Sequence, residues 1–182
     1  MLAVVDLSTF YALFSATCFT LVGLWWNVIH DRPGWMADPG MRRAVGGVYL
    51  TFLLPAVMGL FAQVGGTETP VIWRASFVVV AVIGALSTLA LLARSRDAGR
   101  SVTASRVAGI AVWVLIAIIG VAPELARHVS LKPIEAEAIL LILLVVLGHI
   151  TVWRFMIENP PPGAGAEPDV RTMQRHERSD AV

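Results

Sequence analysis

Five long apolar runs divide the chain, and short polar segments separate them. The runs cover about residues 9–29, 44–64, 73–93, 107–126 and 137–156. An α-helix of about 20 residues is about 30 Å long, which matches the hydrocarbon core of a bilayer. The strands of an outer-membrane barrel are shorter and alternate strictly in polarity, whereas a run such as LILLVVLG does not alternate. The pattern predicts an all-α, polytopic integral membrane protein with a bundle of five transmembrane helices.

Short connections and a polar end complete the predicted organisation. Such connections make consecutive helices antiparallel neighbours, and none is long enough for a catalytic domain outside the membrane. We therefore expect one transmembrane domain over residues 1–158. The prolines of NPPP then end the last helix, and few large apolar residues follow them. A disordered cytoplasmic tail is expected over residues 159–182.

The basic residues are distributed unevenly between the two sides that five spans define. Eleven of the 14 Lys and Arg residues fall on one side. Because cytoplasmic loops are enriched in cations, we expect that side to face the cytoplasm, with the N-terminus outside. The expected location is a bacterial-type plasma (inner) membrane. The eleven cations are Arg32, Arg42, Arg43, Arg94, Arg96, Arg100, Arg106, Arg154, Arg171, Arg175 and Arg178.

Composition narrows the classes of function. The 182 residues are 57% hydrophobic and only 15% charged, with a net charge of +1, whereas soluble domains carry about a quarter charged residues. Dispersed arginines and a small net charge favour the lipid bilayer as partner and argue against nucleic acid. Cys18 is the only cysteine, so it forms no internal disulfide, and we expect it to be a buried apolar filler.

Small and polar residues recur along one face of each of the first four predicted helices. On the first helix they are spaced by four, four, three and four residues, which keeps them on one face, and we predict that this helix is the packing spine of the bundle. The second helix has a similar stripe at steps of four. The two stripes are Ala12, Ala16, Thr20, Gly23 and Asn27, and Gly47, Thr51, Pro55, Gly59 and Gln63.

His149 is an ionisable residue inside the last apolar run. Such a residue is costly at membrane depth and is a candidate functional site. One interpretation is a neutral, hydrogen-bonded histidine that joins two helices, and the other is a proton relay or ligand contact. Asn27 is expected at the same depth, so we predict that Asn27 and His149 meet near the inner leaflet.

A second group of charges falls near the outer ends of the predicted spans. Glu124 can pair with His128 across one helical turn, and Glu135 and Glu137 open the last span. One interpretation is a solvated headgroup layer, in which ion pairs contribute little. The other is an acidic vestibule that concentrates cations, with Glu124 as the residue to test.

No motif in the chain identifies a reaction. There is no phosphate-binding loop, no HExxH, no GxSxG and no metal-ligand spacing, so we expect no cofactor and no metal site, and an enzyme is disfavoured. The preferred interpretation is a channel or transport-type protein that acts as a homo-oligomer. The alternative is an accessory or regulatory membrane subunit that docks partner helices. The candidate pathway residues are His149, Asn27, Thr20, Thr51, Gln63 and Glu124.

Overall fold

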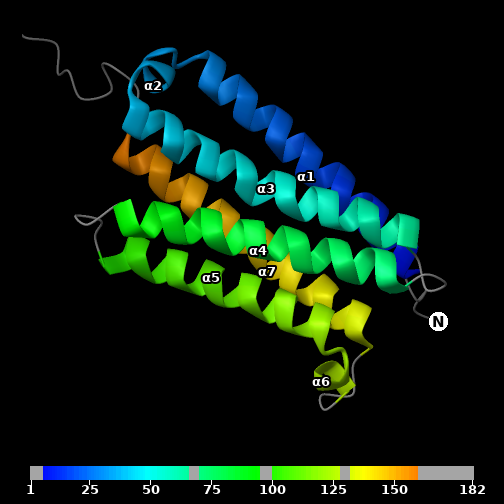
Figure 1. Ribbon diagram of the computed structural model, residues 1–182. Helices are drawn as coiled ribbons and strands as arrows, with labels where there is room; N and C mark the ends of the chain where they lie inside the picture. The colour runs from blue at the N-terminus through cyan, green and yellow to red at the C-terminus, as the bar shows by residue number, and fades with distance from the viewer. Residues whose placement is uncertain (1–5, 66–69, 95–99, 128–131, 160–182) are drawn as a thin grey trace, which may run out of the picture.

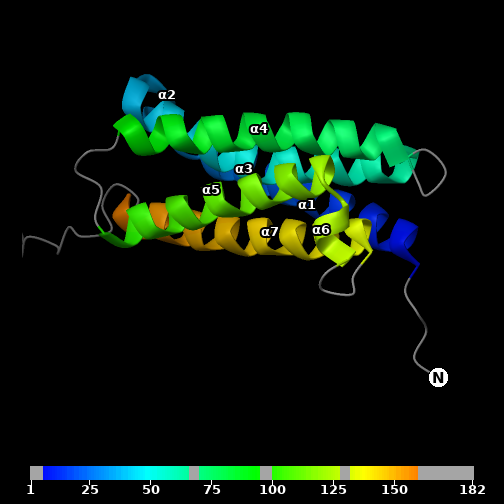
Figure 2. The same ribbon diagram turned by 60° about the horizontal axis from the view of Figure 1, so that its bottom comes forward.

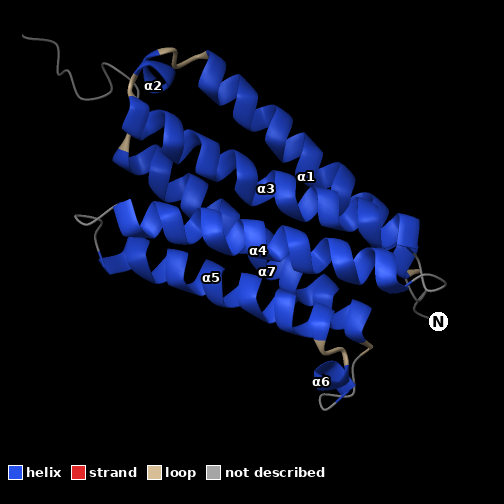
Figure 3. Cartoon of the chain, in the orientation of Figure 1, coloured by secondary structure: helices blue, strands red, loops and turns tan. Residues whose placement is uncertain are grey.

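Five long helices form an antiparallel bundle in the computed structural model, which describes residues 6–65, 70–94, 100–127 and 132–159 (Figure 1). All the secondary structure in these residues is helical (Figure 3). Each long helix is long and apolar enough to cross a membrane, which confirms the prediction of a multi-pass, all-α protein. The long helices are α1 (Leu7–His30), α3 (Pro39–Gly65), α4 (Pro70–Arg94), α5 (Arg100–Val121) and α7 (Pro133–Glu158), and the short ones are α2 (Gly34–Ala37) and α6 (Glu124–Arg127).

The helices extend beyond most of the apolar runs, with one exception. The fourth run was expected to continue to residue 126, but α5 ends at Val121 and α6 starts a separate turn at Glu124. Pro123 lies between them and has no N–H to continue the helical hydrogen bonds. The predicted tail lies outside the described residues apart from Asn159, and so does His128.

Helix α3 occupies the middle of the bundle. It packs against α1, α4 and α7, while α5 packs against α4 and α7 (Figures 1 and 2). Consecutive long helices are therefore neighbours, as the short connections predict. One end of the bundle holds α2, the starts of α3 and α5, and the ends of α1, α4 and α7. Most of the described arginines lie near it, including Arg42, Arg43 and Arg106, so we call it the arginine-rich end. The opposite end, with α6 and the start of α1, is the arginine-poor end (Figure 1).

The prediction that the small-residue stripe of α1 packs the bundle is wrong. All five of its residues are exposed, and a Cβ added at Gly23 would meet nothing within 4 Å. The opposite face is buried instead, and the Ser15 hydroxyl on it donates to the Ala56 carbonyl oxygen of α3 at 3.1 Å. The residues of both faces of α1 recur with the helical period, so the period does not distinguish them. The face with the larger side chains is the buried one, because these side chains make more contact with the neighbouring helices. The buried residues are Tyr11, Ser15, Cys18, Val22, Trp25 and Ile29.

The stripe on α3 does pack against other helices, so α3 is the spine of the bundle. Pro55 and Gly59 are buried, and the rest of the stripe is half-buried. A side chain at Gly59 would collide with Ser15 of α1. Gly84 of α4 is covered in the same way by the indole ring of Trp113 from α5. Small residues thus permit the close helix contacts expected in a membrane. Cys18, on the buried face of α1, is buried as predicted.

Two apolar clusters fill most of the bundle. One lies toward the arginine-poor end and includes Tyr11, Met58, Phe77, Ile116 and Leu141. The other lies toward the arginine-rich end, between α1, α3 and α7, and is rich in aromatic rings. In this second cluster the rings of Trp25, Trp35 and Phe155 meet with centroid separations of 5.0–6.2 Å.

Candidate functional site

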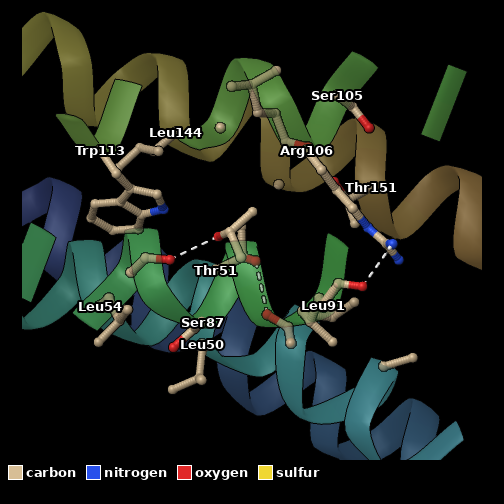
Figure 4. A pocket seen from close by; sticks show the side chains of 18 of the residues that line it. Leu50, Thr51, Leu54, Ser87, Leu91, Ser105, Arg106, Trp113, Leu144 and Thr151 are labelled. Carbon is tan, nitrogen blue, oxygen red and sulfur yellow. Dashed lines mark hydrogen bonds between the residues drawn. The ribbon is translucent and has the colours of Figure 1, made fainter. Parts of the chain in front are cut away.

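A cavity with several polar side chains in a mostly apolar lining lies between α3, α4, α5 and α7 in the arginine-rich half of the bundle. Its volume is about 110 Å³, which exceeds the roughly 10–15 Å³ that one water needs. Figure 4 shows Trp113 at one end of the cavity and the Arg106 guanidinium at the other. We call it the Arg106 cavity. Its polar lining consists of Thr51, Ser87, Thr88, Ser105, Arg106 and Thr151.

Four glycines line the cavity, but only one of them borders open space. Gly47, Gly84, Gly109 and Gly148 each contribute no side chain to the lining. A Cβ at Gly109 would meet nothing within 4 Å, so the wall at this residue faces open space. A Cβ at each of the other three glycines would collide with a neighbouring side chain, so these glycines permit close helix contact and only Gly109 borders open space.

Arg106 is the only charged residue in the lining. Its side chain is half-buried, and its Nη1 donates to the carbonyl oxygen of Leu91 at 3.3 Å. Glu158 lies near enough to interact with it electrostatically. A guanidinium has five N–H donors, so the Leu91 carbonyl uses only part of its capacity. The arrangement presents cationic donors to the cavity.

Three threonine hydroxyls in the lining present acceptors. Thr51, Thr88 and Thr151 each donate to the carbonyl four residues earlier in the same helix, at 2.8–2.9 Å. A hydroxyl that donates in this way keeps its lone pairs for another donor. The cavity can therefore hold ordered water or a small polar solute, with a positive charge at one end.

Two further arginines bind helix carboxyl ends as Arg106 does. At the arginine-poor end, Arg74 of α4 donates from Nε to Gly120 at 2.9 Å and from Nη2 to Val121 at 3.1 Å. Arg32 donates to the carbonyl oxygen of Asn159 at 2.8 Å. The last carbonyls of a helix lack partners within it, and a cation there also complements the helix dipole. Arg106 therefore has a structural role, and what distinguishes it is the cavity beside it.

Of the six predicted pathway residues, the structure places only Thr51 in the cavity. Thr20 and Asn27 are exposed on the outer face of α1, and the Thr20 hydroxyl donates to Ala16 of its own helix at 2.9 Å. Gln63 is half-buried near the arginine-poor end of α3, and Glu124 is exposed at the start of α6. The described residues thus do not bring the six together.

The predicted meeting of Asn27 and His149 is wrong. His149 is exposed, its Nδ1 lies 2.8 Å from the carbonyl oxygen of Val145, and its ring packs edge-on against Phe52 at a centroid distance of 5.4 Å. Asn27 lines a shallow hollow formed by the last turns of α1 and the segment that follows. The prediction rested on the equal membrane depth of the two residues. Depth carries no information about the direction in which a side chain points.

Glu137 is the residue that the sequence interpretation missed. It was grouped with exposed headgroup charges, yet it is 0% exposed, and neither carboxyl oxygen has a hydrogen-bond partner among the described residues. An unsatisfied buried polar group costs about 1–3 kcal/mol, and a charged one costs more. The sequence held no signal for this, because residues 139–147 are apolar on every face of the helix, and only the structure shows that Leu141 and Leu144 share the buried face of Glu137.

The other outer-end charges remain at the surface. Glu135 accepts a hydrogen bond from the backbone N–H of Lys132 at 3.1 Å, and the side chains of the two residues are 3.8 Å apart. The partner predicted for Glu124, His128, lies outside the described residues.

Comparison with family models, curated proteins and solved structures finds no match to this chain.

Proposed function

We propose that this chain is a small membrane protein of transport type whose solute site is the Arg106 cavity. The observation that carries the proposal is a guanidinium that opens on a cavity of about 110 Å³ within the span Thr103–Val121. Arg106 lies in the first turn of that span, and a cation that borders a cavity between spans is a candidate for contact with ions or substrates. The guanidinium donors of the lining suit a small anion, and the hydroxyl oxygens can accept hydrogen bonds from water that is bound with it.

The packing of the bundle supports transport rather than an open channel. Toward the arginine-poor end, buried side chains such as Met58, Phe77 and Ile116 occupy the space between the helices. A solute that enters the cavity from the arginine-rich end meets this apolar core, so its passage requires a rearrangement of the helices. The homo-oligomer expected from the sequence stays part of the proposal, with the exposed face of α1 as its contact surface.

Flux through proteoliposomes tests the proposal. Reconstituted protein is assayed for uptake of chloride, nitrate and formate, first as wild type and then as Arg106→Gln. We expect uptake of at least one anion and at least a tenfold loss in Arg106→Gln. Arg74→Gln is the matched control, because it also removes an arginine from a helix carboxyl end but lies outside the cavity lining. The proposal fails if no anion moves, or if both variants lose flux equally.

A second candidate function rests on the outer face of α1. Its stripe of small residues is exposed, and Gly23 has no neighbour within 4 Å. Small residues are typical of surfaces where membrane helices approach closely. This favours a non-transporting accessory or regulatory subunit that docks a partner helix there.

Chemical cross-linking in native membranes tests this docking face, and the mass of the cross-linked product distinguishes a different partner chain from a second copy of this chain. Gly23→Leu is expected to abolish cross-linked products while the folded bundle persists, because the added side chain would project from the bundle. Leu24→Ala, at an exposed position beside the stripe, is the control. Unchanged cross-linking in Gly23→Leu would remove the docking face from consideration.

A further inference from the structure

Glu137 differs from every other described carboxylate in its surroundings. It lies four residues after Pro133, the first residue of α7, or about 6 Å along the helix axis. Its neighbour Glu135 is half-buried and caps the helix start, whereas Glu137 is 0% exposed with both oxygens unpartnered among the described residues. The two residues are two positions apart, so they point to different sides of the helix.

Helix α1 approaches Glu137 most specifically. The Tyr11 hydroxyl donates to the carbonyl oxygen of Ile134 at 2.7 Å, and Ile134 lies one turn before Glu137 on the same face. The phenol is also close enough to Glu137 for an electrostatic interaction. Leu141, one turn further along, is fully buried in the core cluster that contains Tyr11 and Phe77. A carboxyl group is therefore enclosed between a tyrosine and apolar side chains.

The helices around Glu137 supply no counter-cation among the described side chains. On α4, Arg74 is engaged by the carbonyls of α5, and on α7, Lys132 is exposed and pairs with Glu135. In this half of the bundle, α3 contributes Gln63 and α5 contributes apolar residues. The remaining described titratable side chains on the neighbouring elements, Asp6 before α1 and Glu124 at the start of α6, are exposed, and the side chain of Arg127 on α6 is outside the described part of the chain.

An ionised carboxylate in such a place loses its hydration without gaining a partner, so the neutral acid is the form that fits. We propose that Glu137 is a proton-binding site, and that the arginine-poor end of the bundle is closed around its protonated form. Release breaks the carboxylic O–H bond, passes the proton to water and leaves a carboxylate. Hydration of that carboxylate opens the contact between Tyr11 and the first turn of α7. This inference does not depend on the Arg106 cavity or on flux.

Infrared spectroscopy of the full-length protein in lipid measures the protonation state directly. Exposed carboxyl groups have pKa values of about 4, so at pH about 8 only a protected acid keeps its proton. We expect the wild type to show the carbonyl-stretch band of a protonated carboxylic acid at that pH. The band should disappear in Glu137→Gln and persist in the matched control Glu135→Gln. A wild type without the band, or Glu137→Gln that retains it, overturns the proposal. If Glu137→Gln fails to fold, Glu137→Asp replaces it and should shift the band, while a wild type without the band still overturns the proposal.

Hydrogen exchange tests the opening. As the pH rises until the infrared band is lost, amides near Tyr11 and Ile134 should exchange at least tenfold faster in the wild type than in Glu137→Gln at the same pH. The comparison at equal pH cancels the intrinsic pH dependence of exchange. Equal exchange in the two proteins while the wild-type band is lost would overturn the proposed opening.

Discussion

Toward the arginine-poor end, Met58, Phe77 and Ile116 have no exposed surface and fill the space where α3, α4 and α5 meet α7. Toward the arginine-rich end, the same four helices border a cavity whose mostly apolar lining includes five hydroxyl side chains and Arg106. The ionisable groups differ accordingly. Glu137 is enclosed with no hydrogen-bond partner among the residues that the structure describes, whereas Arg106 reaches a helix carboxyl end beside open space.

The difference places the buried carboxyl group of Glu137 and the Arg106 cavity in separate regions of one bundle. A filled apolar core excludes water. An isolated carboxyl group in such a core is unfavourable in its charged form, because neither water nor a counter-charge stabilises the carboxylate there. A cavity beside a guanidinium retains room for water or solute, which keeps the charge solvated. Helix α7 takes part in both regions, with Glu137 near its start and Thr151 in the cavity lining near its end.

The largest expected effect is loss of packing toward the arginine-poor end. Phe77→Ala should lower the free energy of unfolding by about 3–5 kcal/mol, because it removes a fully buried ring from a filled core. Unfolding in mixed micelles measures the change. Phe19→Ala, at a residue 40% exposed on α1, should change the same quantity by less than about 0.5 kcal/mol. Similar losses of unfolding free energy in the two variants would contradict a filled apolar core around Phe77.

Added volume should distinguish the two halves of α4. Ala81→Leu enters the filled core, where Ala81 is 0% exposed, and should cost about 1–3 kcal/mol of unfolding free energy. Ser87→Leu projects into the Arg106 cavity and should cost less than about 1 kcal/mol while it reduces anion uptake. The same unfolding and flux measurements apply. A larger cost for Ser87→Leu than for Ala81→Leu would indicate that the cavity is not open in solution.

Two of the three arginines that bind helix carboxyl ends, Arg74 and Arg106, should differ in their contribution to stability. Arg74→Ala removes two hydrogen bonds of 2.9 and 3.1 Å and should lower the free energy of unfolding by about 2–3 kcal/mol. Arg106→Ala removes one bond of 3.3 Å and should cost about 1 kcal/mol. Thermal unfolding of the two variants in the same lipid compares them. The reverse order would show that Arg106 has a larger structural role than its single bond indicates.

His149→Ala should have the smallest effect. The imidazole is exposed and bonds within its own helix, so we expect less than about 1 kcal/mol of destabilisation and unchanged anion uptake. Proteoliposome flux and thermal unfolding check both parts. Loss of uptake with normal stability would place the solute pathway at His149, outside the Arg106 cavity.

Hydrophobic run length was sufficient to predict the five long helices, because a membrane span needs about 20 apolar residues whatever its neighbours. It also placed Cys18 inside an apolar helix, where it is buried. Periodicity was less informative about which face is buried. On α1 the exposed series that includes Gly23 and the buried series that includes Tyr11 and Trp25 have the same spacing, so the pattern alone could not choose between them.

The sequence by itself therefore determined the class of fold, the number of long helices and the antiparallel order of neighbours, since these depend on local hydrophobicity and on short connections. Only the tertiary structure decided which face of α1 is buried, that Glu137 is enclosed, and that Arg106 opens on a cavity. Each of these depends on the rotation of one helix against three or more others. Rotation is set by the summed packing of side chains that lie far apart in the chain, such as Gly84 against Trp113 and Gly59 against Ser15.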